Sequence, residues 1–386
     1  MSTAFLAHSD GVEAVVDLDA ITANIRTLTA MSAGSELMVV VKADAYGHGA
    51  VACAGAARTA GVPWVGVATI DEALELRDAG DTGLLLSWVN ARDARFVEAI
   101  AADVQVSSSS PELLDVLAAA ARAAGKPALV HLAVDTGLGR EGALPGAHWH
   151  ELMAHAMRLQ QAGDIEVTGV WSHLACADST GHDSIDAQAT LFTRACEEAH
   201  EAGFRIRYRH LANSAALLTR PDLNFDVIRT GMAVYGLPST DKDTGVHLRP
   251  AMTLRARVID VKRLPAGHAI GYGHTYVTDR ETTVALLPAG YADGLPRNAG
   301  NKPLVSINGR RYSIAGRVSM DQIVVDVGDH EVRVGDHAVF FGAGTYGEPT
   351  VQEWALECDT IAYEIIARLG RRVKHTYVGG GIGGDL

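Results

Sequence analysis

The sequence predicts a (β/α)8 barrel followed by a mostly β domain, and two observations carry this prediction. Up to about residue 240, short apolar runs rich in β-branched residues alternate with Ala-, Leu-, Glu- and Arg-rich stretches of helical period, which is the pattern of a parallel sheet wrapped by helices. After Leu248-Arg-Pro250 the pattern changes to short alternating strands separated by turn signals. We therefore expect a barrel domain over residues 1–245 and a β domain over residues 246–386.

Eight apolar runs in the first part are predicted to be strands, with a helical stretch between most neighbours. They lie near residues 37–42, 64–68, 83–88, 104–107, 128–134, 166–172, 206–211 and 225–229. Two helix starts are clear, because the stretch from Leu18 opens at an acidic cap and Ser110 is followed by a proline at the first helical position. Eight such units imply a barrel of the TIM type.

Five strand-rich segments follow in the second part. They cover residues 252–270, 282–294, 303–314, 322–329 and 337–344. Asn308-Gly309 is a hairpin dipeptide, and Gly267 closes a turn at a position where a positive φ is favoured. These signals predict an all-β arrangement for this part of the chain.

Charge and cysteine content narrow the class of protein. The net charge is −13 with scattered acids, which argues against nucleic acid or an anionic membrane as the main partner and favours a small-molecule ligand. The four cysteines are far apart and form no CxxC pair, so neither disulfides nor a metal site is expected. With no signal-like N-terminus and no run of 18 uncharged apolar residues, we expect a cytoplasmic protein without membrane spans.

The run from Val39 to Gly49, VVVKADAYGHG, points to chemistry. A β-branched strand ends on Lys42 and breaks into a turn that contains Tyr46 and two glycines. Burial at a strand end favours the free amine of a lysine, which attacks carbonyl groups, and pyridoxal 5'-phosphate is the natural carbonyl partner. Tyr46 offers a hydroxyl to a phosphate, and the glycines allow a close backbone approach. The alternative is a lysine that only extends into water.

Further reactive residues follow the later predicted strands, at the end where barrels carry their chemistry. They are Asp135 to Arg140 after the fifth strand, His173 at the end of the sixth, Asn213-Ser214 after the seventh and Arg229 to Met232 after the eighth. The last two loops are those that usually hold phosphate in this fold. The Ser214 hydroxyl and the amides of Gly231 and Met232 are suitable donors. Taken alone, His173 could be a core histidine and Ser214 a helix cap. Taken together, these residues indicate that the loops line a single active-site opening, the mouth of the barrel.

Seven motifs in order across both parts resemble the alanine racemase family. They are VVKADAYGHG, VDTGLGREG, HLANSAA, FDVIRTGMAVYGL, AIGYGHTY, PAGYADG and GRVSMDQ. The resemblance implies a pyridoxal-phosphate enzyme that interconverts L- and D-alanine and supplies D-alanine for peptidoglycan. It also implies a homodimer with shared active sites, since the second base of this family comes from the partner subunit.

The resemblance assigns roles to individual residues. Lys42 matches the lysine that binds the cofactor and acts as one base, and Tyr272 matches the opposing base. Arg229 matches the group that faces the pyridine nitrogen, with His173 beside it. The remaining cofactor contacts match Tyr46, Asn213, Ser214, Gly231, Met232 and Tyr363, and the substrate contacts match Arg140, Met320 and Tyr291, with Tyr291 and Tyr363 narrowing the entry passage.

The residue types fit racemisation. A proton must leave one face of the substrate Cα and return to the other, so two bases on opposite sides are needed. An arginine holds its proton firmly, so it favours an unprotonated pyridine ring that withdraws electrons less strongly than a pyridinium. The weaker electron sink discourages transamination.

One position departs from the family pattern. Many members carry a carbamylated lysine seven residues before the arginine of the DTGxGR motif, and here that place is Ala133. Because an unpaired buried guanidinium is costly, we expect Arg140 to be compensated by another acid or by a small anion such as chloride, and we favour the bound anion. Asp135 is the acid nearby in the sequence, but we expect its carboxylate to be used within its own turn.

Three other functions compete with this interpretation. A pyridoxal-phosphate decarboxylase of similar architecture would keep the lysine but would not need Tyr272. A non-enzymatic pyridoxal-phosphate carrier would be a lone barrel without the β domain. A racemase of broader specificity, for serine as an example, shares all these features, and the sequence does not separate it from an alanine enzyme.

Overall fold

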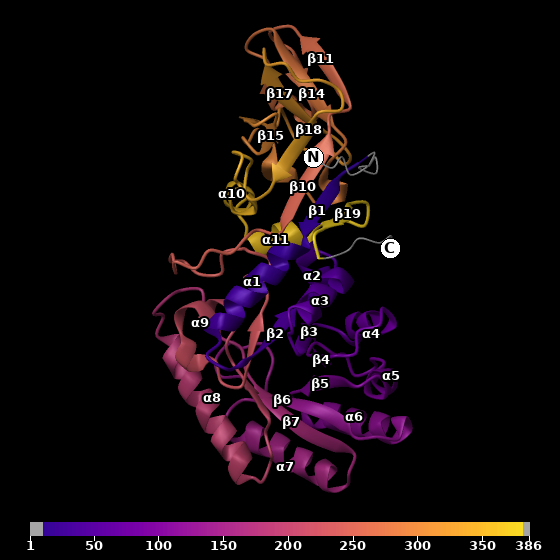
Figure 1. The fold of residues 1–386 in the computed structure, drawn as a ribbon, viewed down its shortest axis with the longest axis vertical. Helices are drawn as coiled ribbons and strands as arrows, with labels where there is room; N and C mark the ends of the chain where they lie inside the picture. Colours follow the sequence, from indigo (N-terminus) through magenta and orange to yellow (C-terminus); the bar gives the residue numbers. More distant parts are fainter. Residues whose placement is uncertain (1–10, 381–386) are drawn as a thin grey trace. The chain divides into compact units, whose positions relative to one another are not determined.

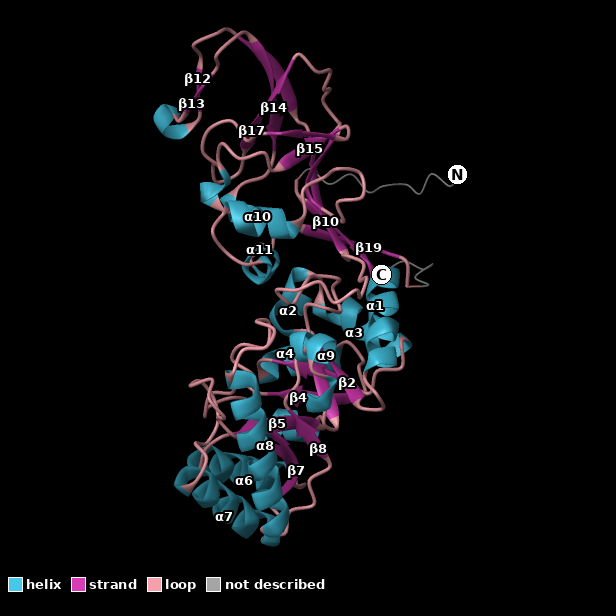
Figure 2. Cartoon of the chain, turned by 90° about the vertical axis from the view of Figure 1, so that its left-hand side faces the viewer, coloured by secondary structure: helices cyan, strands magenta, loops and turns pink. Residues whose placement is uncertain are grey.

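The computed structural model describes residues 11–380, and these form two compact units. One unit comprises Ile21–Ala45 and Ala50–Leu248. The other comprises the chain up to Ala20, the short segment Tyr46–Gly49, and the chain from Arg249 on. Figure 1 labels most of their helices and strands, and Figure 2 distinguishes the two types by colour. Within the described residues, no helix is both long and apolar enough to cross a membrane.

The first unit contains an eight-stranded parallel sheet in the order β8-β7-β6-β5-β4-β3-β2-β9. The strands are β2 (Glu36–Val40), β3 (Trp64–Val67), β4 (Leu84–Ser87), β5 (Val104–Ser108), β6 (Ala128–Ala133), β7 (Ile165–Trp171), β8 (Tyr208–His210) and β9 (Val227–Thr230). All eight predicted strands are confirmed, each within two residues of its expected bounds. The reason is that most of these strands are buried on both faces, which leaves a near-continuous apolar run in the sequence; β8, where Arg209 is exposed, is the exception.

The two end strands of this sheet meet and nearly close the barrel. The Asp226 amide donates to the Arg209 carbonyl at 3.0 Å, and the Arg229 amide donates to the Ala212 carbonyl at 3.0 Å. An isolated parallel bridge joins Asn213 to Arg229. The carboxyl ends of the strands therefore form one ring of loops, which is the end that carries chemistry in such barrels.

Helices alternate with the strands and surround them (Figures 1 and 2). They are α1 (Leu18–Met31), α2 (Lys42–Gly47), α3 (Ala50–Thr59), α4 (Ile70–Asp78), α5 (Phe96–Ala101), α6 (Pro111–Ala124), α7 (Ala147–Gln161), α8 (Ser184–Glu201) and α9 (Ser214–Thr219), with a 3-10 turn η1 (Pro221–Leu223). The predicted caps are confirmed: Asp17 accepts from the Ala20 amide at 2.9 Å, and Ser110 accepts from the Leu113 amide at 3.3 Å.

The second unit is built mostly of strands, as predicted, although two helices, α10 and α11, depart from the expected all-β arrangement. Its six-stranded sheet has the order β16-β15-β18-β10-β1-β19, next to a three-stranded sheet β11-β14-β17 and a pair β12-β13. The elements are β1 (Glu13–Asp17), β10 (Met252–Arg257), β11 (Asp260–Leu264), β12 (Ala269–Ile270), η2 (Tyr272–His274), β13 (Tyr276–Val277), β14 (Thr282–Leu287), η3 (Tyr291–Asp293), η4 (Arg297–Ala299), β15 (Val305–Ile307), β16 (Arg310–Tyr312), β17 (Ile323–Gly328), β18 (His337–Phe341), α10 (Val351–Glu357), α11 (Ala362–Ala367) and β19 (Lys374–Val378).

The sequence analysis assigns no strand to β1, although β1 completes the six-stranded sheet. It pairs antiparallel with β10 and parallel with β19. The two predicted turns are confirmed, since Asn308 (φ 51°) and Gly309 (φ 75°) form the β15–β16 hairpin and Gly267 (φ 78°) lies between β11 and β12.

Candidate active site

Lys42 begins a left-handed turn, with one residue between it and the end of strand β2. Ala43, Asp44, Ala45 and Tyr46 all have φ between 51° and 54°, and Gly47 has φ 77°. Non-glycine residues adopt this conformation at a cost of roughly 1–2 kcal/mol each, so neighbouring groups must hold it. Such strain is typical of functional positions.

Glu72 at the start of helix α4 holds this turn at its first residue. Its carboxylate accepts hydrogen bonds from the amides of Ala43 at 2.8 Å, Ala68 at 2.7 Å and Thr69 at 3.1 Å. Within the turn itself, the Ala45 amide donates to the Val41 carbonyl at 2.7 Å, and Asp44 caps the next helix by accepting from the Ala50 amide at 2.7 Å. The sequence analysis missed Glu72, because only its capping box with Thr69 is legible from local spacing.

Lys42 lies in surroundings that favour its neutral form. Burial lowers the pKa of its ammonium group, the positive charges of Arg140 and Arg229 lower it further, and only Glu72 opposes them. Its Nζ atom lies 5.9 Å from the ring centre of Trp88. A lysine that releases its proton more easily is a better nucleophile and a better base.

Arg229 near the end of strand β9 is buried, and its guanidinium is held on nearly every side. Nη1 donates to the Nδ1 and carbonyl atoms of His210 at 2.9 and 2.8 Å. Nη2 donates to the Ser172 and Leu211 carbonyls at 2.7 and 3.2 Å and to Nδ1 of His173 at 3.2 Å. Within residues 11–380, Nε is the one guanidinium nitrogen without a hydrogen-bond partner. Burial lowers the pKa of Arg229 to about 9, which leaves it a cation at neutral pH.

His173 is placed beside Arg229, as the sequence predicts. Its pKa is lowered to about 3, first by burial and then by the charges of Arg229, Arg140 and Lys42. The imidazole is therefore neutral near pH 7, and its Nδ1 accepts from Arg229. Lys42, Arg140, His173 and Arg229 thus share one cationic mouth.

Glu141 supplies a carboxyl group to this mouth, and the sequence analysis missed it. Its charge interacts with those of Arg140 and Arg229, which lower the pKa, but burial outweighs them and raises the pKa of Glu141 to about 7. Asp135 is occupied by its own loop, as expected, because its Oδ1 accepts from the amides of residues 137, 138 and 139 at 2.9–3.1 Å. Asp135 is therefore not the acid that compensates Arg140. Glu141 interacts with Arg140 but, with a pKa of about 7, it is only partly ionised at neutral pH and compensates that charge in part. The sequence signal that points to Glu141 is its position directly after Arg140.

The two loops expected to hold phosphate lie together. The Gly231 amide donates to Ser214 Oγ at 3.0 Å, and Ala233 donates to the same atom at 3.4 Å. Asn213 caps helix α9 by accepting from the Ala216 amide at 3.0 Å, so the cap is Asn213 and not Ser214. Within residues 11–380, the Met232 amide has no hydrogen-bond partner.

The second unit holds the other predicted site residues. Tyr46 and Tyr363 face each other with ring centres 6.1 Å apart. Tyr291 and Met320 lie on adjoining backbone segments, because the amides of Tyr291 and Ala292 donate to the Ser319 and Met320 carbonyls at 3.0 Å.

Tyr272 begins the turn η2 between two glycines that the local geometry requires. Gly271 and Gly273 have φ of 72° and 74°, and a Cβ atom on Gly273 would lie 2.8 Å from Nη1 of Arg317. The Tyr272 side chain is 70% exposed. The turn therefore presents this phenol on the surface of its unit.

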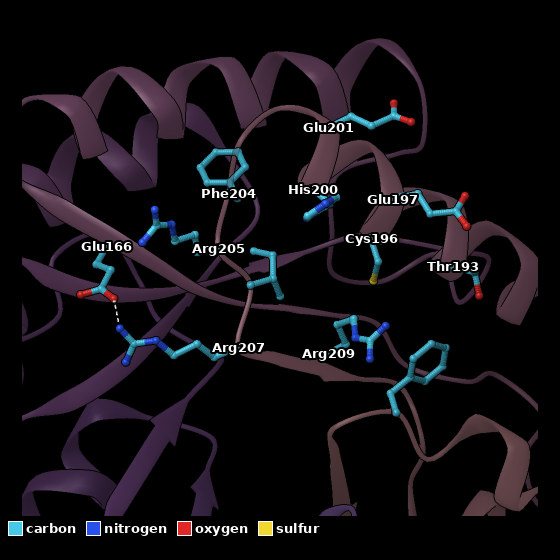
Figure 3. A pocket seen from close by; sticks show the side chains of 12 residues that line it. Glu166, Thr193, Cys196, Glu197, His200, Glu201, Phe204, Arg205, Arg207 and Arg209 are labelled. Carbon is cyan, nitrogen blue, oxygen red and sulfur yellow. Dashed lines mark hydrogen bonds and ion pairs between the residues drawn. The ribbon is translucent and has the colours of Figure 1, made fainter.

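A cavity of about 920 Å³ lies at the opposite end of the barrel strands (Figure 3). It is lined by Glu166 at the start of β7, by the second half of α8, by the chain leading into β8, and by Arg209 and Phe225. Two of its arginines are paired, Arg207 with Glu166 at 2.6 Å and Arg209 with Asp226 at 2.8 Å. The amino ends of barrel strands carry stability rather than chemistry, so we do not place the active site here.

The fold and the mouth define a class of protein: a barrel enzyme built for a pyridoxal-phosphate type of cofactor. The residues present fit this group. Lys42 offers an amine with a weakened hold on its proton, the Arg229 Nε–H is an unpartnered donor within residues 11–380, and Ser214 and the Met232 amide are donors suited to a phosphate.

Comparison with known proteins identifies the family. Residues 16–239 match the family model "Alanine racemase, N-terminal domain", and residues 251–377 match "Alanine racemase, C-terminal domain". The chain is 50% identical to an alanine racemase of Salinispora arenicola over 369 residues, covering 95% of this chain and 98% of that protein. The chain belongs to the alanine racemase family, which is pyridoxal 5'-phosphate dependent.

Solved structures agree with this assignment. The crystal structure of alanine racemase from D-cycloserine-producing Streptomyces lavendulae superposes with a TM-score of 0.94 at 50% identity, covering 97% of this chain and 98% of that chain. The alanine racemase of Streptomyces coelicolor A3(2) gives a TM-score of 0.92 at 47% identity, covering 96% of this chain and 98% of that one. The matches span both units, which disfavours the lone-barrel carrier, and membership of the alanine racemase family disfavours the decarboxylase.

Proposed function

We propose that this protein interconverts L- and D-alanine, with Lys42 and Tyr272 as the two bases. The observation that carries the proposal is the site at the carboxyl ends of the barrel strands. There Lys42, whose pKa is lowered, lies near the buried cation Arg229, whose Nε–H has no partner within residues 11–380. Membership of the alanine racemase family supports alanine as the substrate. Supply of D-alanine for peptidoglycan is the role that fits this reaction.

Pyridoxal phosphate, when bound, supplies a carbonyl for the amine of Lys42 and an electron sink that weakens the Cα–H bond of an amino acid. Lys42 carries the cofactor. Arg229 offers Nε–H to the pyridine nitrogen, since its other N–H groups are already engaged. Ser214, Gly231 and Met232 bind the phosphate from the loops after β8 and β9, together with Tyr46 and Tyr363, and Asn213 fixes the start of α9.

The proton at the substrate Cα is moved by two groups on opposite faces. Lys42 serves one face, and its lowered pKa makes it a base at a more nearly neutral pH. Tyr272 serves the other face. Met320 contacts the substrate carboxylate, Arg140 lies at the substrate site and donates to the ring oxygen of the cofactor, and Tyr291 and Tyr363 narrow the entry passage.

We propose that the active site is shared in a homodimer, with Tyr272 supplied by the partner subunit. Support comes from the exposed surface of the second unit, where Tyr272 is 70%, Met320 52% and Tyr291 40% exposed. Large exposed side chains that lie together, as Tyr291 and Met320 do on adjoining segments, are typical of a surface that a partner covers. A cytoplasmic location is supported by the four cysteines, all of which are free.

The attachment of the cofactor tests this proposal. Borohydride reduction of the holoenzyme fixes the cofactor covalently on the lysine that carries it, and peptide mapping then locates the label. We expect the label on Lys42, in the wild type and in a Lys262→Arg control on an exposed strand. Recovery of the label on any other lysine would overturn the assignment.

A further inference from the structure

A chain of hydrogen bonds runs from Arg229 through the barrel interior to strand β5. Arg229 Nη1 bonds to His210 Nδ1 at 2.9 Å, His210 Nε2 to His131 Nδ1 at 2.7 Å, and His131 Nε2 to Gln105 Oε1 at 2.9 Å. Thr168 adds a hydroxyl bond to the same Gln105 oxygen at 2.9 Å. Gln105, His131 and His210 are fully buried and come from three different strands, β5, β6 and β8.

The direction of every bond in this chain follows from its first member. A guanidinium only donates, so His210 must accept on Nδ1 and carry its hydrogen on Nε2. His131 must then accept on Nδ1 and donate from Nε2, which requires an acceptor at its far side. Gln105 Oε1 is that acceptor. Both imidazoles are neutral, because burial lowers the pKa of His131 to about 3 and that of His210 well below its usual value.

The barrel is built to accommodate these two rings. A Cβ atom on Gly169 would lie 2.4 Å from His131 Nδ1, so only glycine leaves room for this imidazole. The pairing of β6 with β7 shifts register between Val130 and His131, as in a bulge that re-aims a side chain. His210 stacks on Trp171 with ring centres 5.9 Å apart, and the Arg229 guanidinium lies 5.1 Å from the same indole.

We propose that Gln105, His131 and His210 form a positioning relay that fixes the orientation of Arg229. The relay keeps Nδ1 of His210 unprotonated, so that it accepts from Nη1 of Arg229. The Nε–H of Arg229 then remains available to donate to the pyridine ring. None of the three residues touches the reacting atoms, so they are positioning residues. The hydrogen positions do not depend on the reaction, whereas the kinetic effects below rest on the proposed function.

Removing the Gln105 acceptor should change how Arg229 is held. In Gln105→Met the His131 Nε2–H loses its partner, which favours the other tautomer of His131. That tautomer sets two N–H groups against each other between His131 and His210, and His210 is then free to turn its Nδ1 away from Arg229. A buried donor left without an acceptor costs enough to change a rate by about tenfold.

Neutron diffraction from deuterated holoenzyme crystals tests the relay directly. We expect deuterium on Nε2 and a bare Nδ1 in both His131 and His210. Deuterium on Nδ1 of either ring, or on both nitrogens of one ring, would overturn the relay even if the protein racemises alanine as proposed.

Variants of Gln105 test the positioning role. Gln105→Met should lower kcat about tenfold with little change in KM and should shift the visible absorption of the bound cofactor, whereas Gln105→Glu, which keeps an acceptor, should stay closer to wild type. Ser87→Ala, a buried hydroxyl of the same barrel outside the relay, is the control and should leave both readouts unchanged. A wild-type spectrum and kcat in folded Gln105→Met would refute the proposal.

Discussion

Glu141 should make the stability of the protein depend on pH in a way that a single substitution removes. Burial raises the pKa of this carboxyl from 4.5 to about 7, against the opposing charges of Arg140 and Arg229. The unfolded chain releases the proton near pH 4.5, while the folded protein keeps it up to about pH 7. Between these values the folded state binds more protons, so its stability falls as pH rises.

The size of the effect follows from the same shift. Raising the pKa from 4.5 to about 7 corresponds to about 3 kcal/mol of unfolding free energy lost across this range. Glu141→Gln resembles the protonated form and cannot ionise. The variant should therefore match the wild type below pH 4.5 and exceed its stability above pH 7, by up to about 3 kcal/mol.

Denaturant unfolding of the holoenzyme at a series of pH values measures this difference. Glu75→Gln, which changes an exposed carboxyl on helix α4, is the matched control and should follow the wild-type curve. Parallel curves for Glu141→Gln and wild type from pH 4.5 to pH 8 would refute the placement of Glu141 in a buried cationic mouth.

Three further predictions concern the reaction and the assembly. Tyr272→Phe should impair exchange of the α-proton of L-alanine more than that of D-alanine, and equal losses would contradict the division between the two bases. Mixing inactive Lys42→Ala with inactive Tyr272→Phe under subunit exchange should restore one wild-type site per heterodimer; no recovery despite proven exchange would argue against a shared site. Because Ala133 cannot carry a carbamate, activity should not respond to removal of dissolved carbon dioxide, and a loss that bicarbonate reverses would show that another lysine carries the carbamate.

The barrel and the members of its mouth could be predicted from sequence because their signals are local. Strands buried on both faces leave apolar runs, and chemistry follows directly after such runs in a barrel. Lys42, His173 and Arg229 were found by that rule, and the structure brings all three together. The turn at Asn308-Gly309 was found because these residue types favour positive φ.

The features that escaped prediction depend on residues far apart in the chain. The left-handed turn after Lys42 contains alanines that disfavour it locally, and its first amide is bound by Glu72, 29 residues away. Strand β1 pairs with β10 and β19 from the other end of the sequence. The direction of the relay from Arg229 to Gln105 depends on contacts among four strands.

Racemisation by the purified protein tests the central claim most directly. L-alanine, L-serine and L-lysine would be supplied separately with pyridoxal phosphate, and the D-enantiomers measured. The account predicts the highest kcat/KM for alanine and loss of that activity in Lys42→Ala. A higher kcat/KM for serine or lysine, or no D-alanine from a protein that carries the cofactor on Lys42, would contradict it.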